Sequence, residues 1–510
     1  MKKEFLREDG AVLRHPYVTA ALACLVSVFL FDYTADKLTP FSIVLLAAAA
    51  LALAALAAYW YANGMLTPRR VTFLILAFSF LVKLAYVLCT GLGERQHDVG
   101  TFREVSNGHA GRIFRMYGGE IFPEKIASMW YHPPLHYGLE ALWMKFLTWT
   151  GVAESVATHY VTALTLFYSC AASSVCAAIL KEVGLSDRSR NIALSLVAFH
   201  PTFIILAASY NNDMLSVLFM LAALLFAIRW YRSPGYGNIV WLALAIGLGM
   251  MSKLSAGYVA PAVAMLFLIK FIEAEVRFKF IKAKGERLRL FLQYCVFGAI
   301  CVPLGTWWSF YMLWEHGKPL GYVMKLSDKL DQYIGFRSVT ERLLGIPHSF
   351  SEGIWFARAD QGYTNSFFEY KIPSAVVKTS VFGEWDIGKG GAFTEILAYA
   401  LIILNVILIV FSIWCMGRAV RKKFERFERP IKAFFYAFWI TVVLMYVKFC
   451  FDFPHNCTMD FRYIVPAAVV GAMFIGLYSD TLQNKHAKRA VAAVCIAFCA
   501  VSALLYVITA

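Results

Sequence analysis

The sequence predicts an all-α protein that crosses a membrane many times, with about thirteen transmembrane helices. Hydrophobic residues make up 60% of the 510 residues and charged residues only 16%, and the mean hydropathy is +0.60. A soluble chain of this length needs a far more polar surface. The net charge of +15 is gathered in clusters beside apolar segments, which is typical of membrane topology signals rather than of a nucleic-acid-binding surface.

About thirteen apolar segments come near the length of roughly 20 residues that a transmembrane helix needs. They lie near residues 16–33, 41–61, 71–92, 159–180, 191–208, 214–231, 238–252, 254–272, 291–314, 392–416, 431–451, 463–479 and 490–509. The first follows a basic flank and lacks a small-residue cleavage site after it, so we expect a retained helix. Only Ser252-Lys253 separates the seventh from the eighth, which predicts a tight hairpin or a broken helix.

The basic clusters alternate with the predicted spans in a way that fixes an orientation. They precede the first span and follow the second, fourth, eighth, tenth and twelfth: Lys2, Lys3, Arg7 and Arg14; Arg69 and Arg70; Lys181, Arg188 and Arg190; Arg277 to Arg289; Arg418 to Arg429; Lys485, Lys488 and Arg489. All fall on one side if the N-terminus is cytoplasmic, as the positive-inside tendency requires. The other side then carries the loops that hold the unusual polar residues.

The long segment 316–391 falls on this extracytoplasmic side. It mixes aromatic side chains with arginine and lysine, which favours amphipathic helices at the membrane interface.

Asp98 follows the third apolar segment by a few residues. A carboxylate beside hydrocarbon has a raised pKa unless a cation or hydrogen-bond donors keep it ionised. Asp98 is therefore a candidate general base, or a carboxylate that orients an acceptor hydroxyl. The alternative interpretation is a helix cap or a solvated loop residue.

The same loop ends in Tyr131-His132-Pro133-Pro134-Leu135-His136-Tyr137. The tandem proline forces an extended backbone before the next segment and removes backbone donors. Tyr131, His132 and His136 can bind a sugar or an acceptor, or can simply lie at the interface. Four histidines occur in the loop: His97, His109, His132 and His136. Only the last two are spaced i, i+4, and prolines interrupt the approach to them, so we expect no metal site.

Asn212-Asp213 precedes the sixth span. Both residue types are good helix caps, and a carboxylate is favourable at a helix N-terminus. The functional interpretation is a second carboxylate that faces the same cavity as Asp98. The two interpretations are compatible.

Three cations are expected on the extracytoplasmic side: Lys253, Lys378 and Arg462. Cations are less expected there than on the cytoplasmic side. A phosphate group suits them, since arginine offers a bidentate fork and lysine a point charge. The alternative is snorkelling, or pairing with acids such as Asp460 or Glu384.

Taken in order along the chain, these motifs resemble the GT-C superfamily of membrane glycosyltransferases. The resemblance is to the branch of protein O-mannosyltransferases and aminoarabinose transferases, and it rests on Asp98, Pro133-Pro134-Leu135, Phe199-His200-Pro201, Asn212-Asp213, Lys253 and Arg462-Tyr463. It covers a predicted catalytic core of residues 71–480. Residues 1–70 would add two N-terminal helices and residues 481–510 one C-terminal helix. Residues 93–158 would form the first, catalytic extracytoplasmic loop.

The resemblance implies an inverting enzyme that takes a sugar from a polyprenyl-phosphate donor to an acceptor hydroxyl outside the cytoplasm. Asp98 would be catalytic. His97, Tyr131, His132, His136, Asn212 and Asp213 would bind the acceptor or the sugar, and Lys253, Lys378 and Arg462 would bind the donor phosphate. The acceptor would be a protein, a glycan or a lipid. No cofactor, metal or nucleic acid would be needed, and membrane lipids would surround the chain.

One position departs from the mannosyltransferase pattern. Those enzymes carry an Asp-Glu pair in the first loop, whereas this chain has Asp98-Val99. Protein O-mannosylation as such is therefore in doubt, although Glu94, Glu104 or Glu120 can supply a second carboxylate. The rival functional class is a transporter or flippase for a lipid-linked or anionic solute, which also needs many helices and charges within the membrane. Polar residues gathered on one side, without a visible inverted repeat, favour the enzyme over this class and over a non-catalytic scaffold.

Overall fold

The structure is a computed structural model in which the following residues are described: 40–91, 95–96, 98–100, 102, 108–124, 126, 129–277, 280–330, 332–345, 369–385, 390–424 and 427–510. The first predicted span, residues 16–33, and the predicted site residue His97 lie outside these ranges. Within them the chain forms helices and one isolated bridge between Tyr333 and His455, and no strand is found. The predicted all-α class is confirmed.

The longer helices correspond in order to the remaining predicted spans. They are α4 (Pro40–Ala62), α5 (Pro68–Cys89), α9 (Thr162–Glu182), α10 (Asp187–Ala198), α12 (Asp213–Arg232), α13 (Tyr236–Ser252), α14 (Ala260–Arg277), α15 (Phe280–His316), α19 (Ala392–Arg421), α20 (Arg429–Asp452), α21 (Pro466–Thr481) and α22 (Lys485–Ile508). The shorter ones are α6 (His109–Tyr117), α7 (Leu135–Trp149), α8 (Glu154–Ala157), α11 (Pro201–Ile205), η2 (Leu206–Ala208), η3 (Leu254–Val259), α16 (Val339–Leu344), α18 (Ile372–Phe382), η7 (Asn456–Met459) and η8 (Phe461–Tyr463).

Nine helices among the described residues are long and apolar enough to cross a membrane, so the predicted count of thirteen is not confirmed. A tenth span arises if α10 and the α11–η2 segment, bent by 55°, count as one. Pro201 begins α11, where it needs no backbone donor, and the His200 side chain accepts from the Thr202 N–H. The proline therefore explains why the helix breaks at this point.

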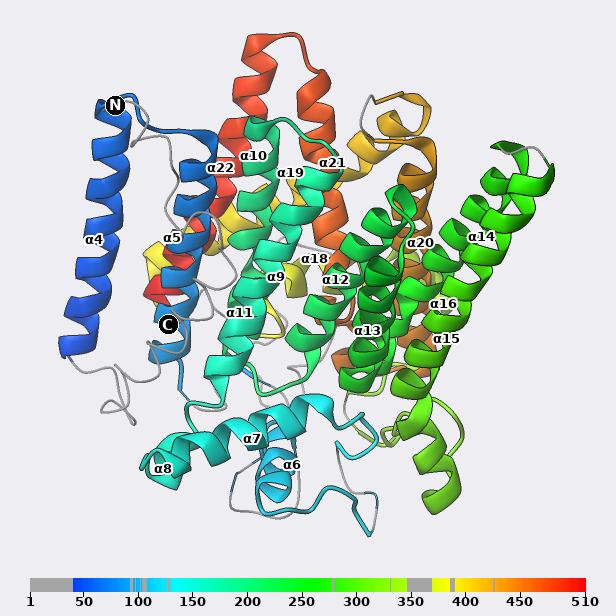
Figure 1. Cartoon of the computed structure of the whole chain (residues 1–510). Coiled ribbons are helices and arrows are strands. Elements are labelled where there is room, and N and C mark those ends of the chain that lie inside the picture. The colour runs from blue at the N-terminus through cyan, green and yellow to red at the C-terminus, as the bar shows by residue number, and fades with distance from the viewer. Residues whose placement is uncertain are drawn as a thin grey trace.

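The two ends of the helix bundle differ in character. In Figure 1, α6, α7 and α8 lie across one end, whereas the turns from α19 to α20 and from α21 to α22 lie at the other. These two turns carry the basic clusters that follow the tenth and twelfth predicted spans. The polar loop that contains Asp98 therefore lies at the end of the bundle opposite these basic turns.

Helices α6 and α7 are amphipathic and pack on each other at this end. Ala110, Ile113 and Met116 are buried on α6, and Tyr137, Ala141 and Met144 are buried on α7. These spacings of three or four residues place each set on one helix face. Trp130 and Tyr210 complete the same apolar cluster. The loop predicted to be catalytic thus has a small core of its own beneath the bundle.

Helix α18 lies inside the bundle rather than at its surface. Ala375, Val381 and Phe382 are buried, and the helix packs against α11, α19 and η8. The described part of the long segment 316–391 therefore contributes to the core, because other elements, α16 and η7 among them, cover Ile372–Phe382.

Helices α13 and α15 approach each other closely. A Cβ at Gly247 on α13 would lie 2.8 Å from the Leu304 Cβ on α15, and a Cβ at Gly305 would lie 2.9 Å from the Met250 sulfur. A side chain at Gly247 would force the helices apart, whereas at Gly305 the flexible Met250 side chain would have to move. The close packing fixes the end of α13, where Lys253 lies.

Candidate active site

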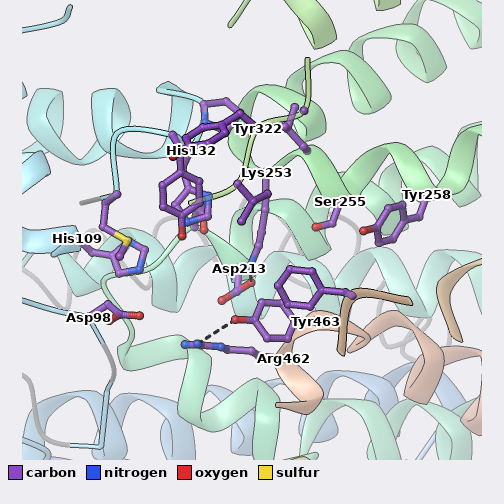
Figure 2. Close-up of a pocket in the computed structure, with 18 of the residues that line it drawn as sticks. Asp98, His109, His132, Asp213, Lys253, Ser255, Tyr258, Tyr322, Arg462 and Tyr463 are labelled. Carbon is purple, nitrogen blue, oxygen red and sulfur yellow. Dashed lines mark hydrogen bonds and ion pairs between the residues drawn. The ribbon is translucent and has the colours of Figure 1, made fainter. Parts of the chain in front are cut away.

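A cavity of about 300 Å³ lies where the α6–α7 layer meets the ends of the long helices. Most of the predicted site residues line it: Asp98, Tyr131, His132, Asn212, Asp213, Lys253 and Arg462. His109, Ser255, Tyr258, Tyr322, Tyr446, Phe449 and Tyr463 line it as well. Figure 2 shows Asp98 and His109 at one side, Lys253 and Asp213 in the centre, and Arg462 beside Tyr463 below. Residues far apart in the sequence thus line one cavity.

Asp98 is held by its backbone while its side chain stays exposed to the cavity. Its φ of +56° lies in the left-handed region, which aspartate tolerates better than most residues. The Asp98 carbonyl accepts from the His109 N–H at 2.7 Å, and the Val99 carbonyl accepts from the Ala110 N–H at 2.8 Å. These bonds satisfy donors in the first turn of α6 that lack partners within the helix. The Asp98 carboxylate makes no cap of α6 and remains available to a ligand.

Gly108 makes this docking possible. Its φ is +100°, and a Cβ at this position would overlap the backbone of Asp98, Val99 and Gly100. No rotation of a side chain can relieve such a clash, since all the atoms in question belong to the backbone. Gly108 is therefore required for the Asp98 segment to close on α6.

We expect Gly108→Ala to reduce activity strongly by displacing Asp98, with little effect on the long helices. Gly119→Ala is the matched control, because Gly119 has a φ of +98° at the other end of α6 and a Cβ there would meet nothing within 4 Å. Both variants carry the strain of alanine at positive φ, so their difference isolates the clash. Rates equal in the two variants would contradict this role for Gly108.

Lys253 and Asp213 form an ion pair in the centre of the cavity wall. Lys253 ends α13 in an extended conformation, and Asp213 opens α12. The Asn212 side chain donates to the Ser252 carbonyl at 2.6 Å and so ties these two helix ends together. Burial lowers the pKa of Lys253, and the adjacent Asp213 carboxylate partly offsets this effect. Asp213 is thus the partner of a cation, and Asn212 has a structural contact beside the cavity.

Arg462 lies on η8 and is positioned by its neighbours. The Asp460 side chain accepts from the Arg462 backbone N–H at 2.8 Å, and its carboxylate lies 3.9 Å from the guanidinium Nε. The guanidinium also donates to the Tyr463 hydroxyl at 3.2 Å (Figure 2). Lys253 Nζ lies 4.6 Å from the centroid of the same Tyr463 ring. Tyr463 therefore holds two cations on one side of the cavity.

His109 and His132 form a stacked wall opposite these cations. Their ring centroids lie 6.0 Å apart, and His109 Nδ1 lies 2.8 Å from the Tyr137 hydroxyl. Burial lowers the pKa of both imidazoles, and nearby cations, Lys253 among them, lower it further. Both rings are therefore neutral at pH 7. His132 was predicted as a site residue from the sequence but His109 was not, because its place depends on how α6 docks on Asp98.

Two predicted site residues lie outside the cavity lining. His136 is buried and its Nε2 bonds the Tyr210 carbonyl at 2.9 Å, which supports the turn before Asn212. Lys378 is 1% exposed on α18. Its neighbour Thr379 accepts from the Phe461 N–H at 2.8 Å. Helix α18 thus packs on η8, the element that carries Arg462. His136 and Lys378 therefore lie near the cavity but outside its lining.

A small second cavity adjoins the first at Arg462. Its lining includes Arg95, Gln96, Glu384 and Asp460. Gln96 accepts from the Tyr210 N–H at 2.9 Å and donates to the Ala208 carbonyl. The chain just before Asp98 is therefore fastened to the segment that leads into Asn212 and Asp213.

Among known proteins, residues 155–296 match the family model described as dolichyl-phosphate-mannose-protein mannosyltransferase. The curated proteins contain no match. Among solved structures, the oligosaccharyltransferase of Archaeoglobus fulgidus in the apo form is similar, with 13% identity, a TM-score of 0.46 and coverage of 85% of this chain. The chain spans 55% of the length of that enzyme.

Two further structures are similar with lower TM-scores. One is the archaeal oligosaccharyltransferase AglB from the same organism in complex with an inhibitory peptide and a dolichol-phosphate, with 14% identity, a TM-score of 0.43 and coverage of 85% of this chain and 55% of that chain. The other is ArnT from Cupriavidus metallidurans, with 13% identity, a TM-score of 0.35 and coverage of 79% of this chain and 76% of that chain. The family-model match over residues 155–296 confirms the predicted resemblance of this chain to the GT-C glycosyltransferases.

Proposed function

We propose that this chain is an integral-membrane, inverting glycosyltransferase that moves a sugar from a polyprenyl-phosphate donor to an acceptor hydroxyl. The observation that carries the proposal is one cavity that brings an exposed carboxylate, Asp98, together with two cations, Lys253 and Arg462. A base and a phosphate-binding group are what such a transfer needs, because the sugar phosphodiester already contains a good leaving group.

In the proposed reaction the acceptor oxygen attacks the anomeric carbon from the face opposite the phosphate. Asp98 accepts the proton of the acceptor hydroxyl as the new carbon–oxygen bond forms. The bond between the anomeric carbon and the phosphate oxygen breaks, and polyprenyl phosphate departs with the electron pair. Lys253 and Arg462 stabilise the charge that develops on the departing phosphate.

The lining of the cavity supports a lipid-linked donor. Leu254, Tyr258, Val323 and Phe449 give part of the wall an apolar character next to Lys253. A polyprenyl chain needs such a surface beside the phosphate site, since its isoprene units gain free energy by leaving water. His109 and His132 offer neutral imidazoles to sugar hydroxyls on the other side.

The basic turns support an active site outside the cytoplasm. By the positive-inside tendency, the end of the bundle that carries Arg418 to Arg429 and Lys485 to Arg489 faces the cytoplasm. The cavity at the opposite end would then open to the extracytoplasmic side of the cell membrane, as the resemblance to the GT-C glycosyltransferases implies.

The experiment that tests the proposal uses purified protein in proteoliposomes. A panel of polyprenyl-phosphate sugars is supplied together with candidate protein, glycan and lipid acceptors, and the products are identified by mass spectrometry. We expect one donor to yield an acceptor whose mass is increased by the sugar. Movement of an intact donor across the bilayer, without a glycosylated product from any donor, would instead assign the chain to the transporter class.

A further inference from the structure

Arg112 is a buried arginine that lies behind the wall of the cavity. It belongs to α6 and is 2% exposed. Its guanidinium lies over three aromatic rings, at 4.8 Å from the centroid of Trp130, 4.1 Å from that of Tyr137 and 5.6 Å from that of Trp308. No ion pair with an acid joins these contacts among the described residues. Among the described residues, rings and backbone carbonyls rather than a carboxylate hold this buried cation, and such an arrangement requires an explanation.

The hydrogen bonds of Arg112 show what it holds. Its Nη1 donates to the Met129 carbonyl at 2.5 Å and to the His132 carbonyl at 2.7 Å. These two carbonyls flank Tyr131, and Met129, Tyr131 and His132 all line the cavity. One guanidinium nitrogen thus fixes both ends of the backbone segment that presents these side chains.

The Met129–His132 segment begins with an unfavourable backbone conformation. Met129 has a φ of +35°, which is outside the ordinary range for a residue with an unbranched apolar side chain. A conformation of this kind is unfavourable and persists only where its surroundings enforce it. The hydrogen bond from Arg112 to the Met129 carbonyl stabilises this backbone conformation directly.

Arg112 also connects the segment to the rigid bundle. Trp308 lies on α15 and is 1% exposed, and Tyr137 lies on α7. The cation therefore joins α6, the cavity wall, α7 and the long helix α15 at a single point. Lysine would keep the charge but would lose the planar group that stacks on rings while it donates to two carbonyls.

We propose that Arg112 is a positioning residue for the proposed sugar transfer, which sets the Met129–His132 wall against the site of Asp98. This inference rests on the proposed function. It makes a structural claim as well, namely that removing the guanidinium frees the Met129–His132 backbone while the bundle stays folded.

The test compares Arg112→Lys, Arg112→Gln and the control Arg115→Gln in the full chain. Arg115 lies three residues further along α6 and pairs with Glu120 at the surface, so its replacement should leave transfer unchanged. In both Arg112 variants we expect amide hydrogen exchange in residues 129–137 to rise about tenfold, with the long helices unaffected. We also expect kcat to fall roughly 100-fold, with the donor KM changed only a few-fold, because misplaced groups cost rate more than binding.

Exchange and kcat at wild-type values in Arg112→Lys would overturn the proposal, because they would show that charge alone is needed. This variant decides the matter if Arg112→Gln fails to fold. If wild-type protein transfers no sugar, the proposed function fails on its own. The exchange measurement then still decides whether Arg112 holds the wall.

Discussion

Replacement of Asp98 by asparagine is expected to lower sugar transfer by roughly 10²–10⁴-fold, the usual contribution of a general base. Asparagine has the same shape and keeps the backbone contacts that fasten the segment to α6, which are the bonds from the His109 and Ala110 N–H groups. It cannot accept the proton of the acceptor hydroxyl. Donor binding and thermal unfolding should therefore stay close to wild type, and the loss should appear in kcat.

Asp328→Asn is a suitable control for this experiment. Asp328 is exposed in the long segment between α15 and α16 and does not line the cavity. Its replacement removes the same charge from the same end of the bundle. If Asp98→Asn turns over as fast as this control, another residue must be the base.

Replacement of Lys253 by glutamine is expected to have two separable effects. It removes a cation from the proposed phosphate site, and a lost charge-stabilising donor typically costs roughly 10²–10³-fold in rate. It also leaves Asp213, whose side chain is 4% exposed, without its partner. Breaking a buried pair on one side costs about 3–5 kcal/mol of stability.

The double variant Lys253→Gln/Asp213→Asn separates these effects. It replaces the ion pair by two neutral side chains of similar shape that can bond to each other, so the free energy of unfolding should return towards that of wild type. Transfer should stay low, because the cation is still absent. Recovery of transfer in the double variant would show that Lys253 acts only through stability.

Lys448→Gln provides the matched control for the pair. Lys448 and Asp452 also form a lysine–aspartate pair, but their side chains are 60% and 47% exposed. Its removal should change the free energy of unfolding by less than about 1 kcal/mol and leave transfer unchanged. The contrast between the two pairs tests whether burial makes Lys253 important.

Much of this architecture could be predicted from the sequence because the membrane imposes strong patterns. The apolar segments predicted the positions of the longer helices, and the basic clusters predicted that the α19–α20 and α21–α22 turns share one end (Figure 1). The number of spans was harder to predict. Pro201 bends one segment, and α13 and α21 are too short to meet the length required of a span.

The site was predictable where a residue's chemistry is unusual for its position in the chain. Asp98, Lys253 and Arg462 are charged residues beside apolar segments, and they meet in one cavity. Asp460 beside Arg462 was among the acids that the sequence offered as a partner. The partner of Lys253 could not be predicted, because its pairing with Asp213 joins the start of one helix to the end of the next. Lys378 was predicted to bind phosphate, but it is buried on α18 outside the cavity lining. Its burial could not be predicted, because the segment around it mixes charged and apolar residues.

The roles of Gly108 and Arg112 depend on contacts that no spacing rule indicates. Gly108 matters because the backbone of Asp98, Val99 and Gly100 lies where a Cβ would be. Arg112 matters because its guanidinium lies over three rings from distant segments. Both lie outside the motifs on which the resemblance rests. They act on the shape of the cavity rather than on its chemistry.

The most direct test of the proposed transfer follows both products of one reaction. Purified protein is mixed with a sugar-charged polyprenyl phosphate and an acceptor, and free polyprenyl phosphate and glycosylated acceptor are measured together over time. We expect the two to appear in equal amounts with wild-type protein, and both to appear at least about 100-fold more slowly with Asp98→Asn. Glycosylated product formed without release of polyprenyl phosphate, or formed equally well by Asp98→Asn, would contradict the proposal.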